Sequence, residues 1–206
     1  MTAMKSAAQD DDDIIARCHA GEAAAFRELY HAHRIGVFRV VARMVTNDAD
    51  REEVTQDVFL QVFRSLRNFK GNAKLSTWIH RIAMNVILQY IRRKKSRVRL
   101  NLEQDISQRA VQTVAGTVAI TPEQSAIQNQ RRAAVERALS ALTPKKRAAL
   151  VLYDFEGLPA IEIAKIVDAS VLTVRTRLFY ARKEFYAQLN HDPACADLNL
   201  EEESAS

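Results

Sequence analysis

The sequence is poor in the residues on which several classes of protein depend. Its two cysteines, Cys18 and Cys195, are too few for a disulfide framework or a four-thiolate zinc site. Five glycines and four prolines do not suit a turn-rich all-β fold, a Gly-rich cofactor fold or a collagen-like chain. No apolar run approaches the ~20 residues that cross a bilayer, and the polar, acidic residues 1–13 do not resemble a secretory signal. These absences favour a helical protein that works in the reducing cytoplasm.

The charges are unevenly distributed along the chain. The 30 Lys and Arg residues against 25 Asp and Glu residues give a net charge of +5, with a sequence pI of about 9.4. Acidic residues concentrate at the two ends, in Asp10–Asp13 and in Asp197 with Glu201–Glu203. The rest of the chain is therefore more basic than its total charge indicates, which is typical of a protein that binds a polyanion. A basic surface that is merely solvated is the alternative.

Apolar residues recur at the three- and four-residue intervals of an α-helix almost throughout the chain. The spacing predicts helices over 23–45 and 48–66, and a third helix that starts at Ser76 or Thr77 and ends in the basic run 92–99. After a stretch rich in Gln, Thr and Ser, Thr121-Pro122 starts a second set of helices. These shorter helices are expected over 123–141, 144–155, 159–167 and 171–189.

This periodicity predicts an all-α fold with two small helical domains joined by a flexible linker. Low hydrophobicity and high charge at the ends predict disorder there. The expected organisation is a partly disordered N-terminal extension (1–22), a first domain (23–96), a linker (97–121), a second domain (122–190) and a disordered acidic tail (191–206).

Residues 159–178 predict a helix-turn-helix, with a short apolar-faced helix, the turn Asp168–Ser170 and a second helix that Ser170 can cap. In such a motif the second helix lies in the major groove of DNA and its N-terminal half meets the base edges. Arginine matches two acceptors of guanine there, and threonine can meet a thymine methyl group. An ordinary helical hairpin with surface arginines is the alternative.

Several short motifs occur in a fixed order along most of the chain. They are Glu52–Phe59, Phe69–Gly71, Ser76–Asn85 and 92–95 in the first half, and 142–152, 156–164 and 173–182 in the second. The first set resembles region 2 and the second resembles region 4 of the extracytoplasmic-function (ECF) sigma factors, the small members of the bacterial sigma-70 family. The resemblance implies a non-catalytic initiation subunit of RNA polymerase, without a metal or cofactor.

In this family, region 2 binds a coiled coil of the polymerase β′ subunit, so the resemblance implies core RNA polymerase, through its β′ and β subunits, as a partner. By this resemblance we assign the polymerase contact to four residues on one predicted helix: Glu53, Gln56, Asp57 and Gln61. A turn that presents acids and amides can meet a basic helical surface. A capped and solvated helix face is the alternative.

The resemblance also implies that region 2 melts the promoter −10 element and binds it as a single strand. A loop that exposes backbone donors can receive a flipped base, while basic residues hold phosphates. Trp78 is expected to pack behind this loop, with a strand-melting wedge as the alternative. The predicted −10 contacts are Phe69, Lys70, Gly71, Asn72, Ala73, Lys74, Trp78, Arg81, Asn85, Arg92 and Arg93, with Lys94 and Lys95 as further phosphate contacts.

Region 4 would read the −35 element as duplex DNA. The predicted contacts are Ser170, Leu172, Thr173, Arg175, Thr176, Phe179 and Arg182, with Lys145 and Arg147 on phosphates. The sequence departs from the family at several positions: Leu172 replaces a common Gly, Tyr180 a common Arg, Gln89 a frequent Asp, and Pro159-Ala160 a common Ser-Tyr. Leu172 and Tyr180 leave the −35 preference open.

The resemblance implies one more partner, an anti-sigma factor that would hold the protein inactive at the inner membrane without direct membrane insertion. Three other functions are the alternatives: a metal site or enzyme using Cys18, His19, His191 and Cys195, an ordinary transcription regulator, and a helical scaffold. For the acidic tail the alternatives are a regulatory extension, an internal competitor for the basic DNA-binding face, and an inert segment.

Overall fold

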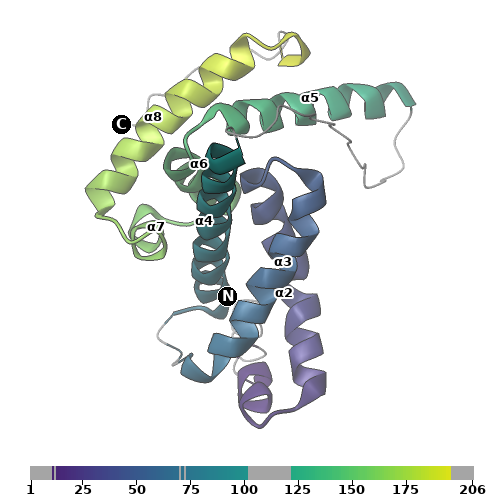
Figure 1. The fold of residues 1–206 in the computed structure, drawn as a ribbon, viewed down its shortest axis with the longest axis vertical. Helices are drawn as coiled ribbons and strands as arrows, with labels where there is room; N and C mark the ends of the chain where they lie inside the picture. Colours follow the sequence, from purple (N-terminus) through teal and green to yellow (C-terminus); the bar gives the residue numbers. More distant parts are fainter. Residues whose placement is uncertain (1–10, 12, 70, 72, 102–121, 196–206) are drawn as a thin grey trace, which may run out of the picture. The chain divides into compact units, whose positions relative to one another are not determined.

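The computed structural model describes residues 11, 13–69, 71, 73–101 and 122–195, apart from the side chains of 98–101 and 122–126. All regular elements in these ranges are helices, which confirms the predicted all-α class (Figure 1). The chain divides into two compact units: unit 1 comprises residues 1–42 and 49–104, and unit 2 comprises residues 43–48 and 105–206. Each unit is described below by itself.

Unit 1 contains most of three long helices and one short turn. These are α2 (Ala23–Met44), α3 (Asp48–Ser65), η1 (Leu66–Asn68) and α4 (Leu75–Asn101). The first two agree with the predicted helices within two residues. The third continues through the whole basic run, so our prediction that a linker starts at residue 97 is wrong for residues 97–101. Long straight-chain residues such as Arg and Lys favour this continuation because they lose little side-chain freedom in a helix.

The core of unit 1 forms where the apolar faces of these helices meet. Aromatic rings join α2 to α3, with Tyr30 and Phe59 at 4.7 Å and Phe26 and Phe63 at 5.4 Å between centroids. Each fully buried aliphatic side chain stabilises such a core by about 1.5–3 kcal/mol. The largest fully buried side chains in this unit are Leu29, Val40, Val41, Leu66, Ile79, Met84 and Ile87.

A helical segment at residues 13–19 precedes α2 and belongs to the packed part of unit 1. Its Ile14, Ile15 and Cys18 are buried. Arg17 fixes the turn that follows, with its Nε 3.0 Å from a Glu22 carboxylate oxygen. The prediction that residues 1–22 are an extension outside the domain is therefore wrong for residues 13–19, while residues 1–10 and 12 lie outside the described part.

In its described residues, unit 2 contains four α-helices and two short turns. They are α5 (Pro122–Ala141), α6 (Pro144–Leu150), the π-helical turn η2 (Val151–Phe155), α7 (Ala160–Ile166), α8 (Val171–Asn190) and η3 (Pro193–Cys195). Helix α8 packs against α5, α6 and α7. The buried side chains that hold these helices together include Leu139, Leu150, Leu152, Ile163, Val174 and Leu178.

The helix predicted over 144–155 widens in its last turn. The Glu156 N–H donates to the Val151 carbonyl at 3.1 Å, which is the five-residue step of a π-helix. Gly157, with φ +67°, then reverses the chain at a backbone conformation that suits glycine. The widened turn lies against α8, where the Phe155 and Phe185 rings meet edge-on at 6.5 Å.

The end of the described chain is ordered beyond the predicted second domain. Asp192 accepts a hydrogen bond from Arg137 of α5, with Nη2 and Oδ2 2.7 Å apart. This contact lowers the pKa of the Asp192 carboxyl group. Cys195 is buried. The prediction of a disordered tail from residue 191 is therefore wrong for residues 191–195, and residues 196–206 lie outside the described part.

Candidate nucleic-acid interface

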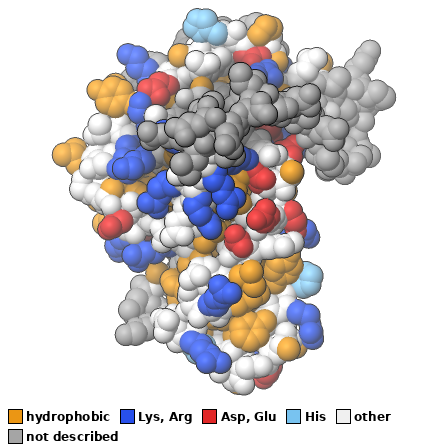
Figure 2. Space-filling view, in the orientation of Figure 1, with side chains coloured by type: hydrophobic (Ala, Val, Ile, Leu, Met, Phe, Trp, Pro, Cys, Tyr) orange, Lys and Arg blue, Asp and Glu red, His pale blue; other side chains and the backbone are white. Residues whose placement is uncertain are grey.

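One face of α3 is buried and the other is entirely exposed. The buried side comprises Arg51, Val54, Thr55, Val58, Phe59 and Val62. The four residues predicted to bind polymerase, Glu53, Gln56, Asp57 and Gln61, are all exposed on the other side. Figure 2 shows acidic side chains grouped on the part of the surface that α3 forms.

Sequence reasoning missed one residue of this face. The Leu60 side chain is 51% exposed, although a leucine on a helix usually packs inward. Because α-helical neighbours on a surface are three and four residues apart, Leu60 lies beside Gln56, Asp57 and Arg64. The sequence did contain a signal for Leu60: it is an apolar residue at a position where the helical period predicts a polar one. The exposed face of α3 therefore combines acid, amide and one apolar side chain.

The loop before α4 is anchored by an aromatic contact. Phe69 is buried, and its ring centroid lies 5.0 Å from that of Trp78. The prediction that Phe69 contacts DNA directly does not fit this position, because its ring is part of the core that supports the loop. The packing of Trp78 agrees with the structural role given to it.

The rest of the predicted loop is only partly described. Gly71 is exposed and has φ +70°, a conformation that side chains disfavour. Ala73 and Lys74 are exposed, and Lys70 and Asn72 lie outside the described residues. The described loop positions that can meet a ligand are therefore Gly71, Ala73 and Lys74.

The predicted −10 residues of α4 form a stripe along one side of the helix. Trp78, Arg81, Asn85 and Arg92 are spaced by three, four and seven residues, which keeps them on one face. Arg81, Asn85 and Arg92 are exposed, while Trp78 is half-buried at the loop end. Arg93 is also exposed, but a rotation of about 100° per residue places it off this stripe.

Lys94 has a partner within unit 1. Its ammonium group and the Tyr90 hydroxyl both donate to the Asp50 carboxylate of α3. Partial burial opposes the charged form of Lys94, but the hydrogen bonds to Asp50 and Tyr90 outweigh it and raise the pKa of Lys94. Lys94 thus joins α4 to α3 although it stays partly open to solvent, and Lys95 is exposed as well.

The helix-turn-helix has the predicted bounds within one residue. Asp168 adopts φ +48°, and the Ala169 N–H donates to the Ala164 carbonyl at 3.0 Å, which ends α7 as a Schellman-type cap. Ser170 caps α8: its Oγ accepts from the Thr173 N–H at 3.0 Å, as expected from the sequence. This cap fixes the start of α8 relative to the turn.

The outward face of α8 carries four of the predicted −35 residues, Leu172, Arg175, Thr176 and Phe179, and all four are exposed. Val174 and Leu178 lie on the opposite, buried face. In Figure 2, hydrophobic side chains stand among Lys and Arg side chains on the side where α7 and α8 lie. The first two turns of α8 are therefore open to a ligand.

Two predicted DNA contacts are engaged within unit 2. Arg182 forms two hydrogen bonds with the Asp154 carboxylate, which raises the pKa of its guanidinium group. Arg147 is buried, and its Nη2 donates to the Ser140 and Leu142 carbonyls at 2.7 and 3.3 Å. Burial lowers the pKa of Arg147. The prediction that Arg147 contacts phosphate is wrong, because its side chain caps the end of α5. Lys145, the other predicted phosphate contact, is exposed.

The site residues proposed for an enzyme or a metal centre are divided between the two units. Cys18 and His19 lie in unit 1, and His191 and Cys195 lie in unit 2. Among the described residues no group of three or more His, Cys, Asp or Glu side chains is placed to hold a metal ion. Burial raises the pKa of the Cys18 thiol, which keeps it protonated near neutral pH.

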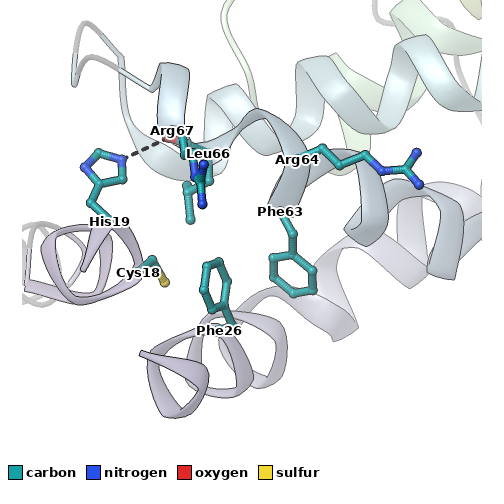
Figure 3. A pocket seen from close by; sticks show the side chains of 7 residues that line it. All are labelled: Cys18, His19, Phe26, Phe63, Arg64, Leu66 and Arg67. Atoms are coloured by element: carbon teal, nitrogen blue, oxygen red, sulfur yellow. Dashed lines mark hydrogen bonds between the residues drawn. The ribbon is translucent and has the colours of Figure 1, made fainter. Parts of the chain in front are cut away.

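Cys18 and His19 instead line an open hollow of about 570 Å³ in unit 1 (Figure 3). The His19 Nε2 donates to the Leu66 carbonyl at 3.0 Å, which uses one ring nitrogen in a structural contact. The other lining residues are Phe26, Phe63, Arg64, Leu66 and Arg67. Arg64 connects this hollow to the exposed face of α3.

Two family models match the chain, and they match the two sets of motifs. Sigma-70 region 2 matches residues 29–97 and Sigma-70, region 4 matches residues 132–185. The chain is 30% identical over 174 residues to the ECF RNA polymerase sigma-E factor of Escherichia coli (strain K12), covering 84% of this chain and 91% of that protein. The chain belongs to the ECF sigma factors of the sigma-70 family. Its function is that of an RNA polymerase sigma factor.

Further relatives agree with this assignment. The ECF sigma factor SigE of Mycolicibacterium smegmatis is 34% identical over 158 residues, which are 76% of this chain and 58% of SigE. The Bartonella quintana sigma factor RpoE, solved in complex with the anti-sigma factor NepR, has the same fold, with a TM-score of 0.64. It is 17% identical and the match covers 81% of this sigma factor and 98% of that chain.

None of the helices in the described ranges is long and apolar enough to span a membrane.

Proposed function

We propose that this sigma factor directs core RNA polymerase to promoters by three separate surfaces and catalyses no reaction itself. The exposed face of α3 binds core polymerase, the loop positions Gly71, Ala73 and Lys74 together with the stripe on α4 bind the −10 element, and α8 reads the −35 element. The observation that carries the proposal is the exposure of all three surfaces on helices whose opposite faces are buried.

The α3 face suits a basic helical partner. Glu53 and Asp57 supply charge, Gln56 and Gln61 supply hydrogen-bonding groups, and Leu60 supplies apolar area at the centre. Interfaces of this kind gain most of their affinity from a few central side chains, while charges at the rim act mainly on the association rate. We therefore assign Leu60 to the centre of the contact, where it contributes to affinity. The Glu53 and Asp57 carboxylates mainly increase the rate at which the two proteins associate.

The α4 stripe suits an opened DNA strand. Arg81 and Arg92 can hold phosphates on either side of Asn85, whose amide can donate and accept at a base edge. Unstacking a base costs a few kcal/mol, which phosphate contacts and capture of the base must jointly offset. The contact between the buried Phe69 ring and the half-buried Trp78 ring keeps the loop in place while the base enters.

The test is reconstitution of transcription. Core polymerase, the full-length chain and a library of promoter fragments should give run-off transcripts that depend on the chain, and the transcribed promoters define the −10 and −35 elements. If the chain forms no complex with core polymerase and no promoter is transcribed, the proposal is wrong. Binding of duplex DNA without any dependence on polymerase would instead support an ordinary regulator.

Two variants separate the surfaces. Asp57→Ala should weaken binding to core polymerase and leave binding to −35 duplex unchanged. Arg175→Ala should do the reverse, with a loss of about 1–3 kcal/mol in discrimination at one base pair if Arg175 contacts guanine through both donors. Arg39→Ala, an exposed residue on α2 that belongs to none of the three surfaces, is the control for a general loss of charge. The opposite pattern would contradict this division of roles.

We further propose an anti-sigma factor as a partner, and the cytoplasm as the place of action. The support is the structural neighbour RpoE, which was solved in complex with the anti-sigma factor NepR. Co-purification of the tagged chain from its host under non-inducing conditions should recover a protein that blocks transcription in the reconstituted assay. Recovery of core polymerase alone would contradict this proposal.

A further inference from the structure

The outward face of α8 carries two large and exposed apolar side chains. The Leu172 side chain is 74% exposed and that of Phe179 is 66% exposed. They are seven residues apart, so they lie on the same face, with Arg175 and Thr176 between them. Two large apolar side chains that project from one face of a short helix offer apolar area to a partner that covers them.

The polar groups on this face are already partly used. The Thr173 hydroxyl lies 2.8 Å from the Ser170 hydroxyl in the cap, and the Thr176 hydroxyl donates to the Leu172 carbonyl at 2.9 Å. Arg175 forms no hydrogen bond or ion pair with any residue that the structure describes. Between residues 172 and 179 of this face, Arg175 is therefore the main hydrogen-bond donor for a base edge. Its neighbours one turn before and one turn after, Leu172 and Phe179, are apolar.

We propose that Leu172 and Phe179 read thymine methyl groups on the two sides of a guanine that Arg175 reads. This inference rests on the proposed function, since it specifies the −35 sequence for the same helix. The thymine methyl is the one apolar group in the major-groove code, and contact with it distinguishes thymine from cytosine at no cost in unpaired polar groups. A leucine or phenylalanine beside a cytosine amino group would bury a donor without a partner.

The spacing sets the size of the element. Seven residues of α-helix rise about 10.5 Å, which corresponds to about three base-pair steps of 3.4 Å. Both thymines and the guanine should therefore lie within about four base pairs, on either strand. A guanine contacted by Arg175 between two T·A pairs is the expected core of the −35 element.

The experiment removes single methyl groups from the DNA. In a promoter transcribed by the reconstituted polymerase, each thymine of the −35 element is replaced in turn by deoxyuridine, and holoenzyme affinity is measured by fluorescence anisotropy. Two replacements that flank a guanine should each weaken binding about threefold to fourfold, the effect of one buried methyl-sized group. In the Leu172→Ala protein one of these effects should disappear, and in the Phe179→Ala protein the other.

Ile161→Ala is the matched control, because Ile161 on α7 is also exposed (58%) but lies outside α8. This variant should keep both uracil effects. Thermal unfolding of each variant checks that α8 is intact. If uracil is neutral at every position, if both alanine variants keep the effects, or if no thymine flanks the guanine, the inference is wrong while the proposed function stands. If no promoter is transcribed at all, the proposed function fails and this inference fails with it.

Discussion

The guanidinium group of Arg182 on α8 lies side-on against the carboxylate of Asp154 in the π-helical turn, with Nε 3.1 Å from Oδ2. A second hydrogen bond joins Nη2 to Oδ1, and the guanidinium carbon lies 5.1 Å from the centre of the Tyr153 ring. Paired donors and acceptors of this kind are the strong form of a charged contact. The pair fastens the recognition helix to the turn before α7.

Breaking this pair should destabilise unit 2. Asp154→Asn and Arg182→Gln should each lower the free energy of unfolding by about 1 kcal/mol, since the side chains are partly exposed. The double variant should lose less than the sum of the two, as measured by urea unfolding. Lys183→Gln, an exposed neighbour, is the control. Additive losses would mean that the two groups do not interact in solution.

Replacing Arg147 should cost more. Its guanidinium group is buried against the Ser140 and Leu142 carbonyls at the end of α5, and those acceptors would lose their donor in an Arg147→Met protein. We expect a loss of about 2–3 kcal/mol in the free energy of unfolding. Lys145→Met, at an exposed position two residues away, should change it by about 0.5 kcal/mol or less. Equal effects of the two changes would refute the capping role.

Leu60 should matter for binding but not for folding. Leu60→Ala removes an exposed side chain at the centre of the α3 face, and we expect about tenfold weaker binding to core polymerase with an unchanged melting temperature. Surface plasmon resonance with immobilised core polymerase measures the affinity. Ile35→Ala, a similarly exposed aliphatic residue on α2 (65%), should bind as the parent does. Normal binding by the Leu60→Ala protein would remove this residue from the interface.

Unit 1 should lose stability in mild acid. Burial lowers the pKa of His33, with the nearby His80 acting in the same direction against the attraction of Asp11. Because the folded-state pKa lies below the unfolded value, this contribution is complete above the unfolded pKa near 6.5 and declines as the pH falls. Urea unfolding should therefore give lower stability at pH 5 than at pH 7.5. His33→Gln should flatten that dependence, and His31→Gln, at an exposed position on the same helix, should not.

The helices could be predicted from the sequence because their signals are local. The apolar period, the Ser170 cap and the turn at Asp168 all act within a few residues, and α2, α3, α7 and α8 begin and end close to their predicted bounds. The all-α class follows from the same signals. The order of the motifs also sufficed to indicate the family.

What failed was the assignment of individual side chains. The motif identifies Arg182 as a position on the recognition helix, but its partner Asp154 is 28 residues away in the sequence. The same holds for Phe69, which contacts Trp78 across the loop, and for Cys195, which packs beyond the predicted domain. No local pattern reveals a tertiary partner, so a basic or aromatic residue in a motif can be engaged internally before any ligand arrives.

The unbroken helix α4 has a consequence for how unit 1 tolerates change in length. Its 27 residues extend over about 40 Å without a kink-forming proline or glycine. The angle about the helix axis between Trp78 and the basic residues at the end of α4 is therefore fixed by the number of residues between them. One alanine inserted after Ile91 would turn Arg92 by about 100° away from Asn85, whereas a seven-residue insertion would restore the phase and only lengthen the reach. Insertions into α4 can therefore change the direction in which Arg92 points and its distance from Asn85 independently of each other.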